Sequence, residues 1–413
     1  MLSPYRVLDL TDERGLLCGQ ILGDLGADVI KVEPLGGSPA RRHGPFYQDE
    51  PHPDRSLFWW AYNRNKRSVT LDIESDAGRE ILHRLVASAD FLIESDAPGL
   101  LAKRGLGYDD LAAVNPALVY VSIAPFGQDG PKAGYADSDL IVWAAGGPLA
   151  LTGDDDRAPV RVSLPQAYLH ASAEAAIAAL IAHFERQRSG KGQHVDVSAQ
   201  QAAGQATIGT ALDAALGGGS ARRLSGRGNY GPLPMRTTYP AKDGYVTISL
   251  HFGTTMGPMT RRLMEYVYEQ GFCDEATRDK DWIAYVELLT SGEEPMEEFE
   301  RVMKILEEFT SSRTKAELLQ AAVERGLLIA PIATIDEVAA SEQLAARDYW
   351  REMEHPELGR SVRYPGPFAK FSETPIDYRR RPPTVGEHNR EVYLDELGLS
   401  EERLAELQSS GVI

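Results

Sequence analysis

Short apolar runs alternate with amphipathic segments along the first half of the chain. Runs of Val, Leu and Ile at residues 5–10 and 27–33 flank an amphipathic stretch at 15–25, which predicts a strand, a helix and a second strand. The alternation continues with expected strands at 68–73, 90–94, 118–123 and 194–198, and expected helices at 76–89, 98–104, 109–114 and 166–188. This pattern predicts an α/β fold whose mainly parallel sheet is covered by helices on both faces.

Glycine and proline mark the boundary of a second region. The helix that follows residue 198 is broken at Gly217, and residues 217–240 are rich in both residue types. A hairpin pattern at 241–248 then leads into acidic helical segments. We expect a large domain at 1–216, a smaller α+β domain at 217–328, and a return to the large domain at 329–413 that ends in an amphipathic helix.

Composition and charge narrow the class of protein. With 413 residues, 43% of them hydrophobic and 25% charged, the chain is long enough for two cores and is not disordered. The net charge of −18 argues against nucleic acid or an anionic membrane as a partner. The two cysteines form no paired motif, and we find no signal peptide or membrane-spanning apolar run. These features predict a cytoplasmic protein.

Common sequence motifs for nucleotide binding, hydrolysis and metal binding are absent from this chain or lack the context that they need. Gly226 to Gly231 fits G-x-G-x-x-G, but Pro232 and Pro234 prevent the helix that a dinucleotide site needs, so we expect a flexible loop. Hydrolase and zinc-protease signatures are absent, and the nine histidines show no close pairing, so we expect no metal site.

Basic residues gather at three places on this acidic chain. The clusters are Arg41-Arg42, residues 63–67 and Lys103-Arg104, each beside the expected end of an element of the sheet. Ligands of doubly wound sheets bind at such ends, so the clusters could hold the phosphates of a large anionic cofactor. The alternative is a solvated rim of helix-terminal charges.

Several segments together resemble the class III CoA-transferase family. They are Val7-Leu-Asp-Leu-Thr, Leu22-Gly-Asp-Leu-Gly-Ala-Asp-Val-Ile-Lys-Val-Glu-Pro, Asn65-Lys-Arg-Ser-Val-Thr-Leu-Asp, Gly105-Leu-Gly-Tyr-Asp-Asp-Leu with Asn115-Pro, Ser189-Gly-Lys-Gly-Gln-His-Val-Asp-Val-Ser, and Val385-Gly-Glu-His-Asn with Leu397-Gly-Leu-Ser. The resemblance covers nearly the whole chain. It implies a Rossmann-like large domain built from both chain ends, a smaller domain, and two interlocked subunits.

The resemblance also implies a binding site for coenzyme A or an acyl-CoA substrate. The contacts that it suggests, with Arg41 added from the basic clusters, are Asp12, Arg14, Arg41, Leu71, Ser95, Lys103 and Arg104. Asp12 stands where some members have a histidine. The loop that begins at Gly226 is similar to the segment that covers the active site in the family.

The family's nucleophile is missing from its usual place. In the family an aspartate attacks the acyl-CoA thioester, and the CoA thiolate then returns to form an aspartyl thioester. Aligned on Leu164-Pro165 and on residues 189–192, that aspartate falls at Tyr168, and Gln166, Ala167, Leu169 and His170 offer no carboxylate. A phenol, with an unperturbed pKa of about 10 against about 3.9 for Asp, cannot take this role.

Three hypotheses follow from this departure. The first is a subunit of a hetero-oligomer that moves CoA from succinyl-CoA to a carboxylic acid, with benzylsuccinate as the best guess, and whose homologous partner carries the catalytic aspartate. The second is an active homodimeric transferase or isomerase that uses another carboxylate, for which Asp139 and Glu174 are candidates. The third is a non-enzymatic scaffold with a degenerate CoA pocket, and in it Tyr168 is simply a packed aromatic residue.

Overall fold

The computed structural model describes residues 1–219, 221, 223–230 and 233–413, which form two compact units. Unit 1 contains residues 1–150, 160–221 and 344–413, and unit 2 contains residues 151–159 and 222–343. The boundary expected at 328 is therefore too early. The chain stays in unit 2 because strand β11 (Ile329–Pro331) pairs with β10 (Gly244–Ile248), and because Glu337 accepts hydrogen bonds from Lys315.

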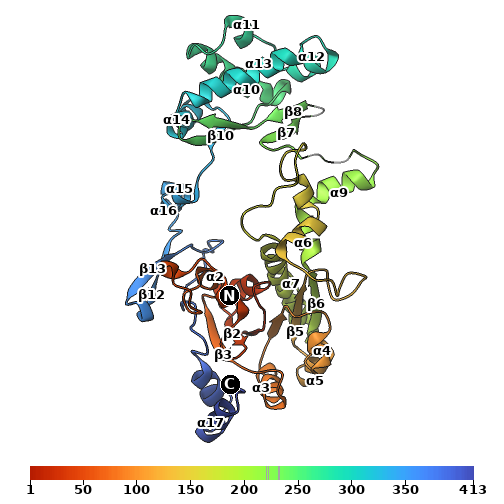
Figure 1. The fold of residues 1–413 in the computed structure, drawn as a ribbon, viewed down its shortest axis with the longest axis vertical. Helices are drawn as coiled ribbons and strands as arrows, with labels where there is room; N and C mark the ends of the chain where they lie inside the picture. The colour runs from red at the N-terminus through yellow and green to blue at the C-terminus, as the bar shows by residue number, and fades with distance from the viewer. Residues whose placement is uncertain (220, 222, 231–232) are drawn as a thin grey trace. The chain divides into compact units, whose positions relative to one another are not determined.

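Unit 1 is built on a six-stranded sheet in which every pair of neighbouring strands is parallel. The order is β3-β2-β1-β4-β5-β6, so the order reverses between β1 and β4. The strands are β1 (Arg6–Asp9), β2 (Asp28–Glu33), β3 (Lys66–Thr70), β4 (Phe91–Glu94), β5 (Val119–Ala124) and β6 (Gln193–Ser198) (Figure 1). This arrangement confirms the expected α/β, Rossmann-like class.

Helices cover both faces of this sheet, each over its own hydrophobic cluster. On one face lie α1 (Leu16–Asp24), α6 (Asp139–Ala145), α7 (Ala167–Ser189) and α8 (Ala199–Gly204), and on the other lie α3 (Asp76–Val86), α5 (Tyr108–Val114) and α17 (Glu401–Ser409). This unit also contains α2 (Leu57–Tyr62), α4 (Leu100–Lys103) and α9 (Ile208–Ala215). A doubly covered sheet explains why its inner strands are almost continuously buried.

Helix α7 differs from one sequence expectation. By length and composition alone it could cross a membrane, although we expected no such apolar span. Half of its most apolar stretch is buried inside the protein. Its alanines, among them Ala171, Ala175 and Ala179, let the helix lie close to the sheet and to α1.

The C-terminal segment returns to unit 1 and protects the edge of the sheet. The backbone N–H of His388 donates to Ser68 O at 2.9 Å, and Asn389 Oδ1 accepts from Thr70 N at 2.9 Å. These bonds use groups that an edge strand would otherwise leave open to pairing. The hairpin of β12 (Arg351–His355) and β13 (Arg360–Tyr364) precedes this segment, and α17 lies near β3 in Figure 1.

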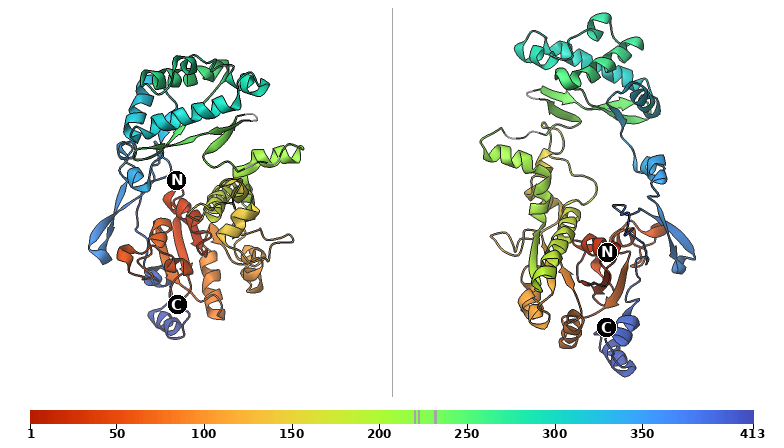
Figure 2. Two further views of the ribbon diagram at one scale, coloured as in Figure 1. Left: turned by 45° about the horizontal axis from the view of Figure 1, so that its top comes forward. Right: turned by 180° about the vertical axis from the view of Figure 1, so that it is seen from behind.

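Unit 2 has its own core over a three-stranded antiparallel sheet of order β11-β10-β9. Its other elements are β7 (Arg227–Tyr230), β8 (Leu233–Arg236), β9 (Thr238–Ala241), α10 (Gly253–Glu269), α11 (Glu275–Arg278), α12 (Tyr285–Ser291), α13 (Met296–Ser311), α14 (Lys315–Arg325) and α15 (Ile335–Ala339). The long helices gather on one side of this sheet (Figure 2). Where we expected a flexible loop after Gly226, β7 pairs with β8 in a hairpin, and Gly231 lies outside the described residues.

Candidate coenzyme site and its acyl-transfer residues

A pocket of about 500 Å³ opens at the carboxyl ends of β1, β2, β3 and β4. It lies where the strand order reverses, the place at which open parallel sheets bind their ligands. Leu10, Val32 and Leu71 give it apolar walls, and Asp12 and Arg104 are among its polar groups. The apolar walls can therefore pack against a flat ring of a ligand, while the polar residues of the pocket form hydrogen bonds with polar groups at the edge of that ring.

Three of the expected coenzyme contacts, Asp12, Leu71 and Arg104, line this pocket directly. Arg104 follows α4, and its Nε donates to Glu74 Oε2 at 3.0 Å. Lys103 is exposed at the end of the same helix. Lys103 and Arg104 thus lie at the rim of the pocket, where they can bind an anionic group of a ligand while remaining partly solvated, so that no unpaired charge is buried.

Asp12 is held by two of its expected neighbours. Arg14 donates from Nε to both carboxylate oxygens, at 2.9 and 3.1 Å, and Ser95 Oγ donates to Asp12 Oδ1 at 2.8 Å. Burial alone would raise the pKa of Asp12, but the hydrogen bonds and charge of Arg14 outweigh burial and hold it below its usual value. The carboxylate is therefore ionised and fixed in direction at the pocket wall.

Of the other basic residues in the three clusters, Arg42 is exposed, but the rest are not available to a ligand. Arg41 is 1% exposed, and its guanidinium donates to Glu33 Oε2 at 2.7 Å and to Asp54 Oδ1 at 2.8 Å. Residues 64, 66 and 67 are likewise buried and paired with carboxylates. The expectation that these clusters hold phosphates is wrong for Arg41 and for the three basic residues of 63–67, which form internal ion pairs instead.

Tyr168 lies in the first turn of α7, directly after the first helical residue Ala167, and is 8% exposed. Its hydroxyl donates to Oδ2 of Asp137, and the same oxygen lies 3.8 Å from Nη1 of Arg14. Burial, reinforced by the negative charge of Asp137, raises the pKa of Tyr168. The phenol therefore remains protonated and acts as a hydrogen-bond donor.

Neither carboxylate that the sequence suggested as a substitute nucleophile is placed for that role. Asp139 Oδ1 accepts from the backbone N–H groups of Gln166 at 2.8 Å and Ala167 at 2.7 Å, so it caps the start of α7. Glu174 is exposed further along α7. Asp137 is not among the residues expected from the sequence, because its only local signal is its place two residues before the capping aspartate.

Glu94, the residue before the expected contact Ser95, has a perturbed environment of its own. It ends β4, is 4% exposed, and accepts from the backbone N–H of Asp96 at 2.7 Å. Burial raises the pKa of Glu94 to about 7, although a hydrogen bond with Ser122 opposes the shift. Ser122 Oγ lies 2.9 Å from His194 Nε2, so a polar row crosses β4, β5 and β6 beside a second pocket of about 450 Å³.

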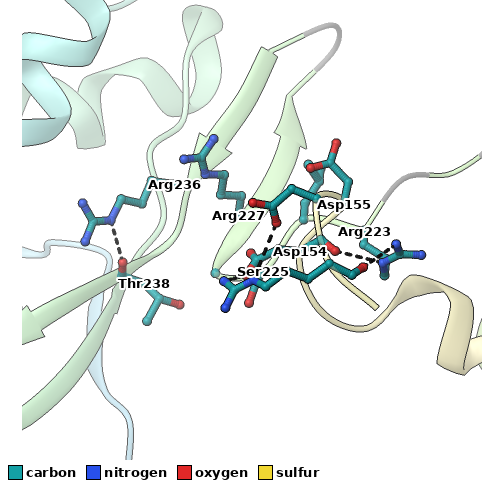
Figure 3. Close-up of a pocket in the computed structure, with 11 residues that line it drawn as sticks. Asp154, Asp155, Arg223, Ser225, Arg227, Arg236 and Thr238 are labelled. Atoms are coloured by element: carbon teal, nitrogen blue, oxygen red, sulfur yellow. Dashed lines mark hydrogen bonds and ion pairs between the residues drawn. The ribbon is translucent and has the colours of Figure 1, made fainter. Parts of the chain in front are cut away.

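Unit 2 carries a separate open pocket of about 740 Å³ (Figure 3). Its lining mixes the aspartates of residues 154–156 with arginines from β7, β8 and the segments beside them. Arg223 donates to the carbonyl oxygens of Asp154 at 3.0 Å and Arg157 at 2.9 Å, which ties two stretches of the unit together. Arg157 pairs with Asp154, and Arg236 pairs with Glu307, so part of this charge is neutralised within unit 2.

Comparisons with known proteins agree over nearly the whole length of the chain. A sequence model described as CoA-transferase family III matches residues 2–389. Succinyl-CoA:(R)-benzylsuccinate CoA-transferase subunit BbsE of Thauera aromatica is 37% identical over 394 residues, covering 95% of this chain and 93% of that protein. Succinyl-CoA--D-citramalate CoA-transferase of Chloroflexus aurantiacus is 32% identical, covering 100% of this chain and 98% of that protein. The crystal structure of a CAIB/BAIF family protein from Brucella suis matches with a TM-score of 0.80 at 29% identity, covering 95% and 98% of the two chains.

Proposed function

The chain belongs to CoA-transferase family III, and on that premise we propose that it is one subunit of an enzyme that moves CoA from succinyl-CoA to an aromatic succinate such as benzylsuccinate. The observation that carries this proposal is the similarity, over 95% of this chain, to a protein named as a subunit of such an enzyme. A second relative also takes CoA from succinyl-CoA by its name, which supports the same donor.

The pocket at the switch point suits the adenosine end of coenzyme A. Leu10, Val32 and Leu71 would pack against the adenine ring, and Asp12 or Asp96 would accept from ribose hydroxyl groups. Arg104, with Lys103 beside it, would meet the phosphates at the rim. A carboxylate-rich wall is unfavourable for phosphate, so we place the phosphates at this basic edge and not deeper.

A homologous partner subunit is the second part of the proposal. It would carry an aspartate where this chain has Tyr168, and so supply the family's usual nucleophile. Two apolar rows on unit 1 support pairing with another chain: Ile177, Ile181 and Phe184 on α7 are 53%, 65% and 79% exposed, and Ile208, Leu212 and Leu216 on and just after α9 are similarly open. Residues three and four apart share one helix face, so each row would bury a continuous apolar surface.

The test is co-expression with a homologous chain that has Asp at the aligned position. The purified complex is incubated with succinyl-CoA and (R)-benzylsuccinate, and benzylsuccinyl-CoA is measured by chromatography. We expect turnover by the complex, and CoA binding by this chain in calorimetry. A complex that forms no benzylsuccinyl-CoA would refute the substrate assignment, and a chain that binds no CoA would favour the scaffold hypothesis.

A further inference from the structure

Asp137 brings a carboxylate to the hydroxyl of the residue that replaces the family nucleophile. It comes from the connection between β5 and α6, and Tyr168 comes from α7, 31 positions along the chain. We propose that Asp137 takes over the nucleophile's role, so that this chain's own site is competent for acyl transfer. The proposal rests on the proposed transferase function and adds a second reactive carboxylate to the assembly.

The two oxygens of Asp137 have different surroundings. Oδ2 accepts from Tyr168 and lies 3.8 Å from Nη1 of Arg14. Within the described part of the chain, no hydrogen bond or ion pair involves Oδ1, and the side chain is 24% exposed. One oxygen is therefore held and the other is free to form a bond, which is what a positioned nucleophile requires.

Asp137 is also connected to the coenzyme pocket. Arg14, which faces Asp137, donates to both oxygens of Asp12, and Asp12 lines the pocket. The hydroxyl of Ser172, one turn after Tyr168 on α7, donates to the carbonyl oxygen of Arg14 at 3.0 Å. These bonds fix the loop after β1 against α7. They connect Asp137 through Arg14 to Asp12, which lines the pocket.

The other carboxylates near this point are engaged or covered. Both oxygens of Asp12 are bound by Arg14, and Asp139 caps α7. Glu13 has an oxygen without a partner among the described residues, but that oxygen is buried. Asp137 is the carboxylate in this group that combines a held oxygen with an accessible one.

The reaction is balanced without an outside oxidant or acid. Oδ1 of Asp137 attacks the thioester carbonyl carbon, an O–C bond forms, and the C–S bond breaks with its electron pair on the CoA thiolate. The thiolate then attacks the carbonyl carbon of the Asp137 side chain, and the first acid leaves as its carboxylate. The second acid's carboxylate attacks this aspartyl thioester, and the thiolate returns to its acyl carbon, which releases Asp137 unchanged.

Tyr168 and Arg14 would act as positioning residues in these steps. The protonated phenol keeps the carboxylate in one orientation, and Arg14 places a positive charge beside the oxygen that does not attack. Burial alone would lower the pKa of Arg14, but its pairing with Asp12 and Asp137 raises it, so the guanidinium stays charged throughout.

The test uses the complex with the partner subunit, in which the partner's aligned aspartate is changed to asparagine. It is incubated with succinyl-CoA and hydroxylamine, which converts an aspartyl anhydride or thioester to a hydroxamate, and the modified residue is mapped by peptide mass spectrometry. We expect the label on Asp137 of this chain. Asp137→Asn should remove it, and Asp129→Asn, an exposed aspartate in the same connection, should leave it unchanged.

The outcomes separate this inference from the proposed function. A wild-type complex that forms benzylsuccinyl-CoA while this chain carries no hydroxamate, or carries it on Glu13, would overturn the role of Asp137 and leave the proposed function standing. A wild-type complex without any CoA transfer would instead refute the proposed function. Because the label is read on the unsubstituted chain, the result does not depend on how well the Asp137→Asn variant folds.

Discussion

Asp9 at the end of β1 joins the three strands that form one side of the coenzyme pocket. It is fully buried, and its Oδ1 and Oδ2 lie 3.1 and 2.8 Å from the Nζ atoms of Lys31 on β2 and Lys66 on β3. Both lysines are buried as well. We predict that Asp9→Asn, which keeps the shape and removes the charge, strongly destabilises unit 1, because two buried ammonium groups would then share no anion.

Two routes give the size of this effect. Removing one partner of a buried ion pair costs about 3–5 kcal/mol. Burial would raise the pKa of Asp9, but Lys31 and Lys66 outweigh it and lower it from 3.8 to about 2. At 1.36 kcal/mol for each pKa unit, this difference corresponds to about 2 kcal/mol. We therefore expect a loss of about 2–5 kcal/mol, a large fraction of a typical domain stability of about 5–15 kcal/mol.

The assay is urea unfolding at neutral pH, followed by circular dichroism. The matched control is Asp76→Asn, which removes a fully exposed partner of Arg79 and should leave the midpoint of unfolding close to that of the wild type. The stabilisation by Asp9 is complete above its unfolded pKa of 3.8 and is lost as the pH falls towards 2, so the gap between wild type and Asp9→Asn should close over that range. Equal midpoints for Asp9→Asn and Asp76→Asn at pH 7 would refute the argument.

Three further predictions concern the site itself. Burial raises the pKa of Glu94 from 4.5 to about 7, so ionisation of Glu94 lowers the free energy of unfolding as the pH rises through this window. Glu94→Gln should therefore raise the free energy of unfolding by up to about 3 kcal/mol at pH 8, seen as a higher melting temperature, and should change it little at pH 4. Tyr168→Phe should cost about 1.5–3 kcal/mol in thermal unfolding, because it removes a donor to a charged acceptor. Arg104→Ala should weaken CoA binding about tenfold in calorimetry, as expected for one lost charge-assisted bond, whereas the exposed Arg188→Ala should not.

The alternation of apolar runs was sufficient to predict most of unit 1, because a parallel sheet covered on both faces needs buried strands between amphipathic helices. It placed β3 two residues late, at 68–73. That strand begins with Lys66 and Arg67, whose charges look like a solvent-facing turn until Asp9 and Asp28 are seen to neutralise them. Those partners lie on other strands, so only the sheet order reveals them.

The same limit applied to the coenzyme site. Asp12, Leu71 and Arg104 were expected from the family resemblance, and the structure brings them to one pocket because parallel strands place their carboxyl ends at one edge. Arg41 could not be assigned correctly, since a basic residue after a strand looks the same in sequence whether it faces a phosphate or a buried glutamate such as Glu33.

The placement of Asp137 shows how a carboxylate from another segment of the chain can occupy the position where the family has its nucleophilic aspartate. Asp139 caps the first N–H groups of α7, and this cap ties the start of α6 to the start of α7. A residue two positions earlier is thereby brought over the first turn of α7, where Tyr168 meets it. The acyl-transfer position is thus reachable from two segments of the chain, and an aspartate on either can serve it. Substitution of the first need not end the chemistry while the second remains beside Arg14.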